Sequence, residues 1–169
     1  MLAQNHVKQK SPDLFNDLKF ADKLVVWSVR VWVRDFVSGG NSHVVLSECF
    51  KLARIPMAYP ILDSIMTIYA SLDCEIKNIR CVRCQQLSSE ETRFLSLISV
   101  FQENRSMDNI GPYLRLWMPN TVCRVIQQPC EEFAIILKRA GLILSGRPFF
   151  RPLEKNEESY ARKDDLYHK

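Results

Sequence analysis

Apolar residues recur at helical spacing along the first third of the chain, and this pattern restricts the fold more than any other feature. Six of them follow one another at intervals of three or four residues: Leu18, Ala21, Val25, Val29, Trp32 and Phe36. This spacing predicts one face of an α-helix that begins near Leu14, after Ser11-Pro12-Asp13, and ends at Gly39-Gly40. The stretch from Val25 to Val37 is also rich in β-branched residues, so a strand is the alternative there.

The basic residues of this segment have the same period as the apolar ones. They are Lys19, Lys23, Arg30 and Arg34. We therefore expect them together on the opposite side of the helix.

Two further helices are predicted before residue 73. Asn41-Ser42 can cap a helix that runs to about Arg54, with Val45, Cys49 and Leu52 on one face. Pro56 ends it, and a third helix follows from about 57 to 72. Its two adjacent apolar stripes make a wide face, which is typical of a central helix or an oligomer contact.

The second half of the chain carries clear helix start and stop signals. Ser88-x-x-Glu91 is a capping box and predicts a helix bearing Phe94, Leu95, Ile98 and Phe101. A short helix is expected between Gly111-Pro112 and Pro119, and another from Asn120-Thr121. Pro129 predicts a break or kink before a final helix, with Glu131 and Glu132 in its first turn and Lys138 and Arg139 in its last. Gly141 would cap that helix, and residues 142–150 are expected to be extended.

These elements predict an all-α fold, a compact bundle of about six helices with an ordered Cys-containing loop near 73–87. With 169 residues and five glycines, the chain is long enough for one core and poor in the turns of a β-sandwich or barrel. We expect a flexible N-terminus at 1–10, a single helical domain at 11–150 and a disordered charged tail at 151–169.

Charge and cysteine content limit the classes of function and location. The net charge is +4, and charges of both signs are interspersed along the chain. No apolar run approaches a membrane-spanning length. The first residues lack the apolar core of a secretory signal. Six cysteines without an export signal favour free thiols in the cytoplasm.

The best candidate for local chemistry is the cluster Cys74, Cys81 and Cys84, whose last two members have C-x2-C spacing. Such a turn supplies two thiolates to zinc or to an iron–sulfur cluster, and a fourth ligand would come from Cys49, Cys123, Cys130, His43 or a partner subunit. Arg80 and Arg83 would favour a reactive thiol or contact with an anion. Unmetallated loop thiols are the plainer interpretation.

Nothing in the sequence forms a catalytic signature. Cys49, Cys123 and Cys130 lie in or beside helical patterns, where cysteine usually packs as a small apolar residue. None of His6, His43 and His168 belongs to a recognisable nucleophile or metal motif. The protein is therefore predicted not to be an enzyme.

Aromatic residues on the first helix suggest an interface. Trp27 lies off the main apolar stripe, and Trp32 and Phe36 extend it. Core packing explains most of these side chains, but the excess of aromatic surface favours a dimer or partner interface at Trp27, Trp32 and Phe36.

The segment Leu137–Ile143, followed by Ser145-Gly146-Arg147, resembles the helix-then-turn ending of winged-helix DNA-binding proteins. That resemblance implies nucleic-acid contacts by Lys138, Arg139 and Arg147. A usual wing needs two strands, which Pro148 and Pro152 would interrupt, and an ordinary C-capped helix explains the same residues.

The sequence therefore favours a non-enzymatic helical binding protein that self-associates or binds a protein partner. A metal- or redox-responsive regulator using Cys74, Cys81 and Cys84 is the first alternative, and a nucleic-acid-binding regulator is the second. The combination of C-x2-C, L-S-x-E-E and L-K-x-A-G-L resembles small helical proteins of bacteria, and this resemblance implies no function.

Overall fold

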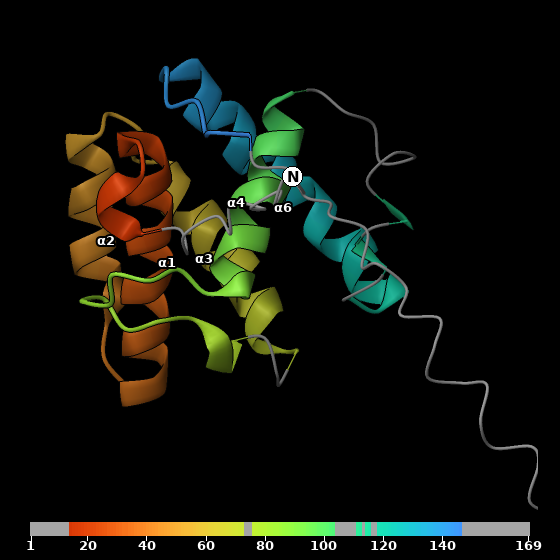
Figure 1. Cartoon of the computed structure of the whole chain (residues 1–169), viewed down its shortest axis with the longest axis horizontal. Helices are drawn as coiled ribbons and strands as arrows, with labels where there is room; N and C mark the ends of the chain where they lie inside the picture. Colours follow the sequence, from red (N-terminus) through yellow and green to blue (C-terminus); the bar gives the residue numbers. More distant parts are fainter. Residues whose placement is uncertain (1–13, 73–75, 104–110, 113, 116–117, 147–169) are drawn as a thin grey trace, which may run out of the picture.

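The protein folds as a bundle of α-helices, as the sequence predicts (Figure 1). This computed structural model describes residues 14–72, 76–103, 111–112, 114–115 and 118–146. The helices described there are α1 (Phe20–Ser38), α2 (Ser42–Leu52), α3 (Ala58–Ala70), α4 (Ser89–Gln102) and α6 (Asn120–Arg139), with 3-10 turns η1 (Phe15–Asp17) and η2 (Ile76–Asn78). No strand occurs within these ranges, so α1 is a helix and the alternative of a strand is wrong.

Helix α3 lies at the centre of the bundle. It packs against α6, α2 and α1, and α6 also packs along α4. Leu62, Ile65 and Met66 on α3 are almost completely buried, and Phe50 of α2 meets Phe133 of α6 edge to face at 6.4 Å between ring centres. The centre of the wide apolar face of α3 is thus covered within the chain itself, whereas Ile61 and Ile68 are partly buried.

Helix α1 begins six residues later than the sequence predicts. Leu14 forms an isolated antiparallel bridge with Gln86, and the Phe15 N–H donates to the Gln85 carbonyl at 2.6 Å. These long-range backbone contacts replace the first helical turn, so the predicted start at Leu14 is wrong. The predicted end is correct, because Gly39 caps α1 with a φ of +68°.

The basic residues of α1 do not share one exposed side. Lys19 and Arg34 are exposed, but Arg30 is 1% exposed and belongs to the core. Helical period places Arg30 on the same side of α1 as these residues, but it does not show what packs against that side chain. In this fold the face of Arg30 meets α4 and the loop before it.

Helix α6 continues through Pro129 as one helix of 20 residues. The predicted break is wrong, and Glu131 and Glu132 lie mid-helix rather than in a first turn. Proline at this position removes one backbone hydrogen bond. Burial of Ile126, Cys130 and Phe133 on either side stabilises the continuous helix.

The described part of the segment after α6, residues 142–146, has no regular secondary structure and is held by hydrogen bonds to α4. Gln102 of α4 donates from its amide to the Leu142 carbonyl and accepts from the Leu144 N–H, each at 2.9 Å. The predicted N-terminus at 1–10, the charged tail at 151–169 and residues 147–150 lie outside the described residues. In the part that is described, no helix combines the length and apolarity needed to cross a membrane.

Candidate functional site: an apolar groove and a cysteine turn

Helix α2 has two apolar faces, and only one of them faces the core. Leu46 and Phe50 are fully buried. The face predicted from Val45, Cys49 and Leu52 turns outward instead: Val45 is 44% exposed, Leu52 is 85% exposed and Cys49 is half-buried. Cys49 and Leu52 of this outward face line a groove.

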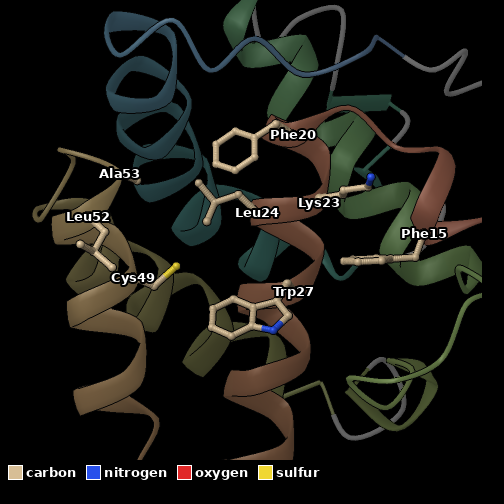
Figure 2. A pocket seen from close by; sticks show the side chains of 8 residues that line it. All are labelled: Phe15, Phe20, Lys23, Leu24, Trp27, Cys49, Leu52 and Ala53. Carbon is tan, nitrogen blue, oxygen red and sulfur yellow. The ribbon is translucent and has the colours of Figure 1, made fainter.

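The groove lies between the first half of α1 and the end of α2, with a volume of about 450 Å³ (Figure 2). Its lining consists of Phe15, Phe20, Lys23, Leu24, Trp27, Cys49, Leu52 and Ala53. Figure 2 shows Trp27 and Cys49 pointing into the space between the two helices. Because Gly39–Asn41 joins α1 to α2 as a tight connection, the two helices run antiparallel, and the last turn of α2 lies across the groove from the first half of α1.

The rim of the groove holds large apolar side chains in contact with water. Phe20 is 67% exposed and Leu52 is 85% exposed, whereas Leu24 is buried. Burial raises the pKa of the Cys49 thiol, so Cys49 remains neutral and contributes to the apolar lining. Among the described lining residues Lys23 alone is charged.

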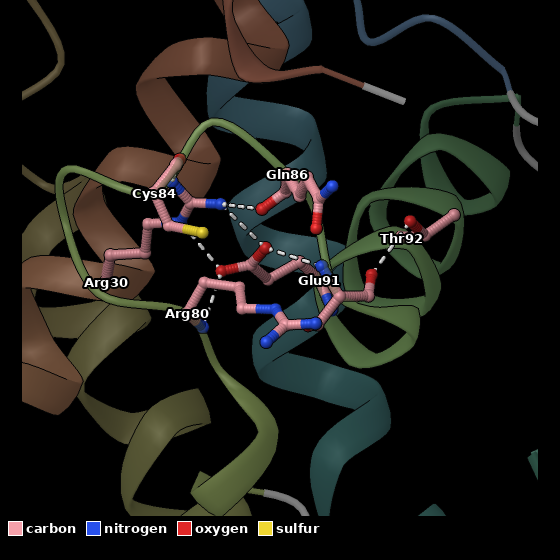
Figure 3. Close-up of polar contacts among 7 residues, drawn as sticks. Arg30, Arg80, Cys84, Gln86, Glu91 and Thr92 are labelled. Carbon is pink, nitrogen blue, oxygen red and sulfur yellow. Dashed lines mark hydrogen bonds and ion pairs between the residues drawn. The ribbon is translucent and has the colours of Figure 1, made fainter. Parts of the chain in front are cut away.

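One end of the groove depends on the loop between η2 and α4. The Phe15 backbone N–H bonds to Gln85, and the Phe15 ring lies 5.2 Å from the guanidinium carbon of Arg30. Residues 80–86 are themselves held by a buried ion pair between Arg30 and Glu91 (Figure 3). The groove wall at Phe15 therefore rests on that ion pair.

Both members of the ion pair also bond to the surrounding backbone. Arg30 donates from Nε and Nη2 to the two oxygens of Glu91 at 2.7 and 2.9 Å. It also donates to the carbonyls of Cys84 and Gln86. Glu91 additionally accepts from the backbone N–H groups of Arg80 and Ser88. A buried charge pair is tolerated when such bonds replace water, so the role of Arg30 and Glu91 is to fix this loop.

Glu91 joins the ion pair to the predicted capping box. The Ser88 hydroxyl accepts from the Glu91 N–H at 3.1 Å, and the Glu91 carboxylate accepts from the Ser88 N–H. The helix start at Ser88 is thus confirmed. Its glutamate has a second partner, Arg30, that the local sequence does not reveal.

The candidate metal site is placed only in part. Cys81 is exposed and Cys84 half-buried, at the two ends of a turn closed by the Cys84 N–H and the Cys81 carbonyl at 3.0 Å. Cys74 lies outside the described residues. Within the described ranges, no three His, Cys, Asp or Glu side chains gather closely enough to hold a metal ion.

Among the described residues, no other cysteine or histidine joins Cys81 and Cys84 in a metal-ligating group. Cys123 and Cys130 are buried in α6, where burial raises the pKa of each thiol. His43 is exposed and packs edge-on against Tyr59. His6 and His168 lie outside the described residues.

The three predicted interface aromatics have different surroundings. Trp27 is half-buried and lines the groove. Trp32 is buried, and its indole N–H donates to Asp63 at 2.7 Å. Phe36 stacks on Trp32 at 4.9 Å and is 56% exposed. Trp27 and Phe36 therefore lie on different parts of the surface of α1.

The predicted nucleic-acid residues do not form one described patch. Lys138 donates to the Gln102 carbonyl at 2.6 Å and satisfies the end of α4. Arg139 is exposed, and Arg147 lies outside the described residues.

Sequence reasoning missed Phe20 and Leu52 as site residues. A second apolar face on α2, beside the one formed by Leu46 and Phe50, was the available signal. An 11-residue helix at the edge of a bundle needs only one such face for the core.

Comparison with protein-family models, with curated proteins and with solved structures found no match to this chain. The function must therefore be argued from the groove and the cysteine turn themselves.

Proposed function

We propose that this chain is a non-enzymatic binding protein that accommodates an amphipathic helical segment of a partner protein in the α1–α2 groove. The observation that carries the proposal is the exposure of Phe20 and Leu52 beside an apolar floor. Burying a Leu or Phe side chain contributes about 1.5–3 kcal/mol, so a partner that covers both residues gains substantial affinity.

The shape of the groove favours a helix as the occupant. Two antiparallel helices form its walls, and a third helix that lies between them buries its residues at i, i+3, i+4 and i+7. The lining offers aromatic rings at Phe15, Phe20 and Trp27 and aliphatic or thiol groups at Leu24 and Cys49. These groups complement Leu, Ile or Met on the partner.

Lys23 adds a charge to the recognition. Its side chain is half-exposed at the groove. An acidic residue at the edge of the partner's apolar face would pair with it and set the orientation of the segment. The expected partner is thus an amphipathic helix with at least one Asp or Glu beside its apolar stripe.

Selection from a displayed library of helical peptides tests this proposal. Peptides are selected on the wild-type protein and counter-selected on Leu52→Asp. Val125→Asp is the matched control, because Val125 is an apolar residue of α6 with 60% exposure and does not line the groove. We expect enriched peptides with apolar residues at helical spacing and an acid, which bind wild type and Val125→Asp equally.

Because the Leu52→Asp variant loses a Leu contact, we expect it to bind the selected peptides at least tenfold more weakly. Failure to enrich any peptide, or equal binding to Leu52→Asp, would contradict the proposal. A second copy of the chain is the competing occupant predicted from the sequence. A dimer in sedimentation that Leu52→Asp dissociates would replace the foreign helix with self-association.

A metal- or redox-responsive regulator is the second candidate, and the exposed Cys81–Cys84 turn favours it. Zinc or an iron–sulfur cluster would use these two thiolates together with Cys74. Cys81→Ser should then lower both the bound metal and the melting temperature. Unchanged metal content and stability would remove the metal form of this candidate.

The nucleic-acid alternative stays a prediction for Lys138, Arg139 and Arg147. It requires salt-sensitive DNA binding that weakens on Arg139→Ala. The hydrogen bond of Lys138 to α4 means that Lys138→Ala also changes a helix end, so Arg139 is the better probe.

A further inference from the structure

We propose that Cys81 and Cys84 form a thiol–disulfide exchange site that reacts with a small disulfide of the glutathione type. This site is separate from the groove and needs neither Cys74 nor a metal.

The spacing of the two cysteines fits an intramolecular disulfide. They occupy the first and last positions of a hydrogen-bonded turn, with the Cys84 N–H donating to the Cys81 carbonyl. The ends of such a turn have Cα atoms less than about 7 Å apart. A disulfide spans about 4.4–6.8 Å between Cα atoms, so the Cα separation of such a turn is compatible with one.

Exposure assigns different roles to the two thiols. Cys81 is exposed, so its thiolate can reach and attack a dissolved disulfide. Cys84 is half-buried and lies beside it, as a resolving thiol should. Of the other described cysteines, Cys123 and Cys130 are buried and Cys49 lies in the groove.

Charge near the turn suits an anionic oxidant. Arg80 and Arg83 are both exposed and flank Cys81 in the sequence. Glutathione disulfide carries several carboxylates, so these two cations favour its approach.

The turn is held in place by the buried ion pair. Arg30 donates to the Cys84 and Gln86 carbonyls, and Glu91 accepts from the Arg80 N–H. The backbone is therefore anchored immediately before Cys81 and at Cys84 itself (Figure 3). This anchoring keeps the thiols close and lowers the entropy cost of joining them.

The reaction balances in two exchange steps. The Cys81 thiolate attacks one sulfur of glutathione disulfide, forms a mixed disulfide and releases one glutathione thiolate. The Cys84 thiolate then attacks the Cys81 sulfur and releases the second glutathione. Two protein thiols are oxidised to one disulfide, one glutathione disulfide is reduced to two glutathione molecules, and the two protons pass to the leaving thiolates.

Mass spectrometry of the folded full-length chain in glutathione redox buffers tests the proposal. Trypsin cleaves after Arg80 and Arg83, which places Cys81 and Cys84 on separate peptides. We expect a linked pair of these peptides, lighter than their sum by two hydrogen atoms, that disappears on reduction with dithiothreitol. Cys74→Ser should retain the linked pair, and Cys84→Ser should leave Cys81 as the mixed disulfide with glutathione.

The opposite results would overturn the proposal. These are a wild-type Cys81 that stops at the mixed disulfide, a link of either cysteine to Cys74 instead, or a Cys81–Cys84 link that forms only in urea. Circular dichroism of each variant in the same buffer identifies any that is unfolded, and for an unfolded serine variant the corresponding alanine variant replaces it.

Discussion

Two regions around helix α1 use opposite chemistry. On one, the charged residue Arg30 is completely buried, and its guanidinium bonds to Glu91 and to the carbonyls of Cys84 and Gln86. On the other, the apolar residue Phe20 is 67% exposed and faces Leu52 of α2 across a groove. The first region is internally satisfied and serves the fold. The second has apolar surface without a partner among the described residues, and that is where binding is expected.

The two regions are connected through Phe15. Its ring lies over Arg30, its N–H bonds to Gln85, and its side chain lines the groove. The buried polar network therefore supports one end of the binding surface. Substitutions in the network should lower the stability of the fold more than they weaken binding. Substitutions at the rim should weaken binding alone.

The largest effect is expected from Glu91→Ala. This change leaves Arg30 charged and unpaired in the core and removes half of the capping box, so the free energy of unfolding should fall by about 3–5 kcal/mol. Urea unfolding followed by circular dichroism measures it. Glu48→Ala breaks an exposed ion pair with Lys51 and is the control, with an expected change below about 1 kcal/mol. Similar losses in both variants would contradict a special role for Arg30 and Glu91.

Two leucines on α2 distinguish its core face from its groove face. Leu46→Ala should cost about 2–5 kcal/mol of unfolding free energy, because Leu46 is fully buried. Leu52→Ala should change stability by less than about 0.5 kcal/mol, because Leu52 is 85% exposed. Thermal or urea unfolding of the pair gives the comparison. A large loss in Leu52→Ala would mean that the groove is closed in solution.

The cap of α4 should have an intermediate effect. Ser88→Ala removes the acceptor of the Glu91 N–H but keeps the Arg30–Glu91 pair, so we expect a loss of about 1 kcal/mol. Ser88→Asp retains a capping acceptor beside that N–H, but brings a charge close to Glu91. Ser88→Thr is therefore the better matched control, and it should preserve stability in the same urea experiment. Equal loss in Ser88→Ala and Ser88→Thr would indicate that packing, not capping, matters there.

The smallest effect concerns the charge at the groove. Lys23→Gln should weaken a selected acidic peptide by no more than about fivefold and should reduce the salt dependence of binding, since a partly exposed ion pair contributes about 0.2–1 kcal/mol. Titration calorimetry at two salt concentrations measures both quantities. Lys51→Gln, on the exposed surface of α2 outside the groove lining, should change neither. An unchanged salt dependence in Lys23→Gln would remove Lys23 from the recognition.

Local signals predicted much of this fold from the sequence. The Ser88–Glu91 capping box and the Gly39 cap are confirmed because each depends on residues only a few positions apart. Pro129 was misleading because tertiary burial of Ile126 and Phe133 outweighs one lost backbone hydrogen bond. The predicted start of α1 was wrong because Leu14 and Phe15 bond to residues about 70 positions away.

The site was less predictable than the fold, because it too depends on contacts between residues far apart in the sequence. The aromatic excess indicated an interface at Trp27, and Trp27 does line the groove, but whether a partner binds there is still a prediction. Phe20 and Leu52 were missed because exposure depends on how α1 and α2 pack, which their own period does not determine. The burial of Arg30 could not be predicted because its partner Glu91 is 61 residues away.

Nuclear magnetic resonance mapping with the selected peptide tests the central claim most directly. The ¹⁵N-labelled protein is titrated with that peptide, and the amide shifts are followed to saturation. We predict that the largest changes fall on the two groove walls, Phe15–Trp27 and Cys49–Ala53, and disappear in Leu52→Asp while persisting in Val125→Asp. Largest changes near Phe36, or along α6, would contradict a binding site between α1 and α2.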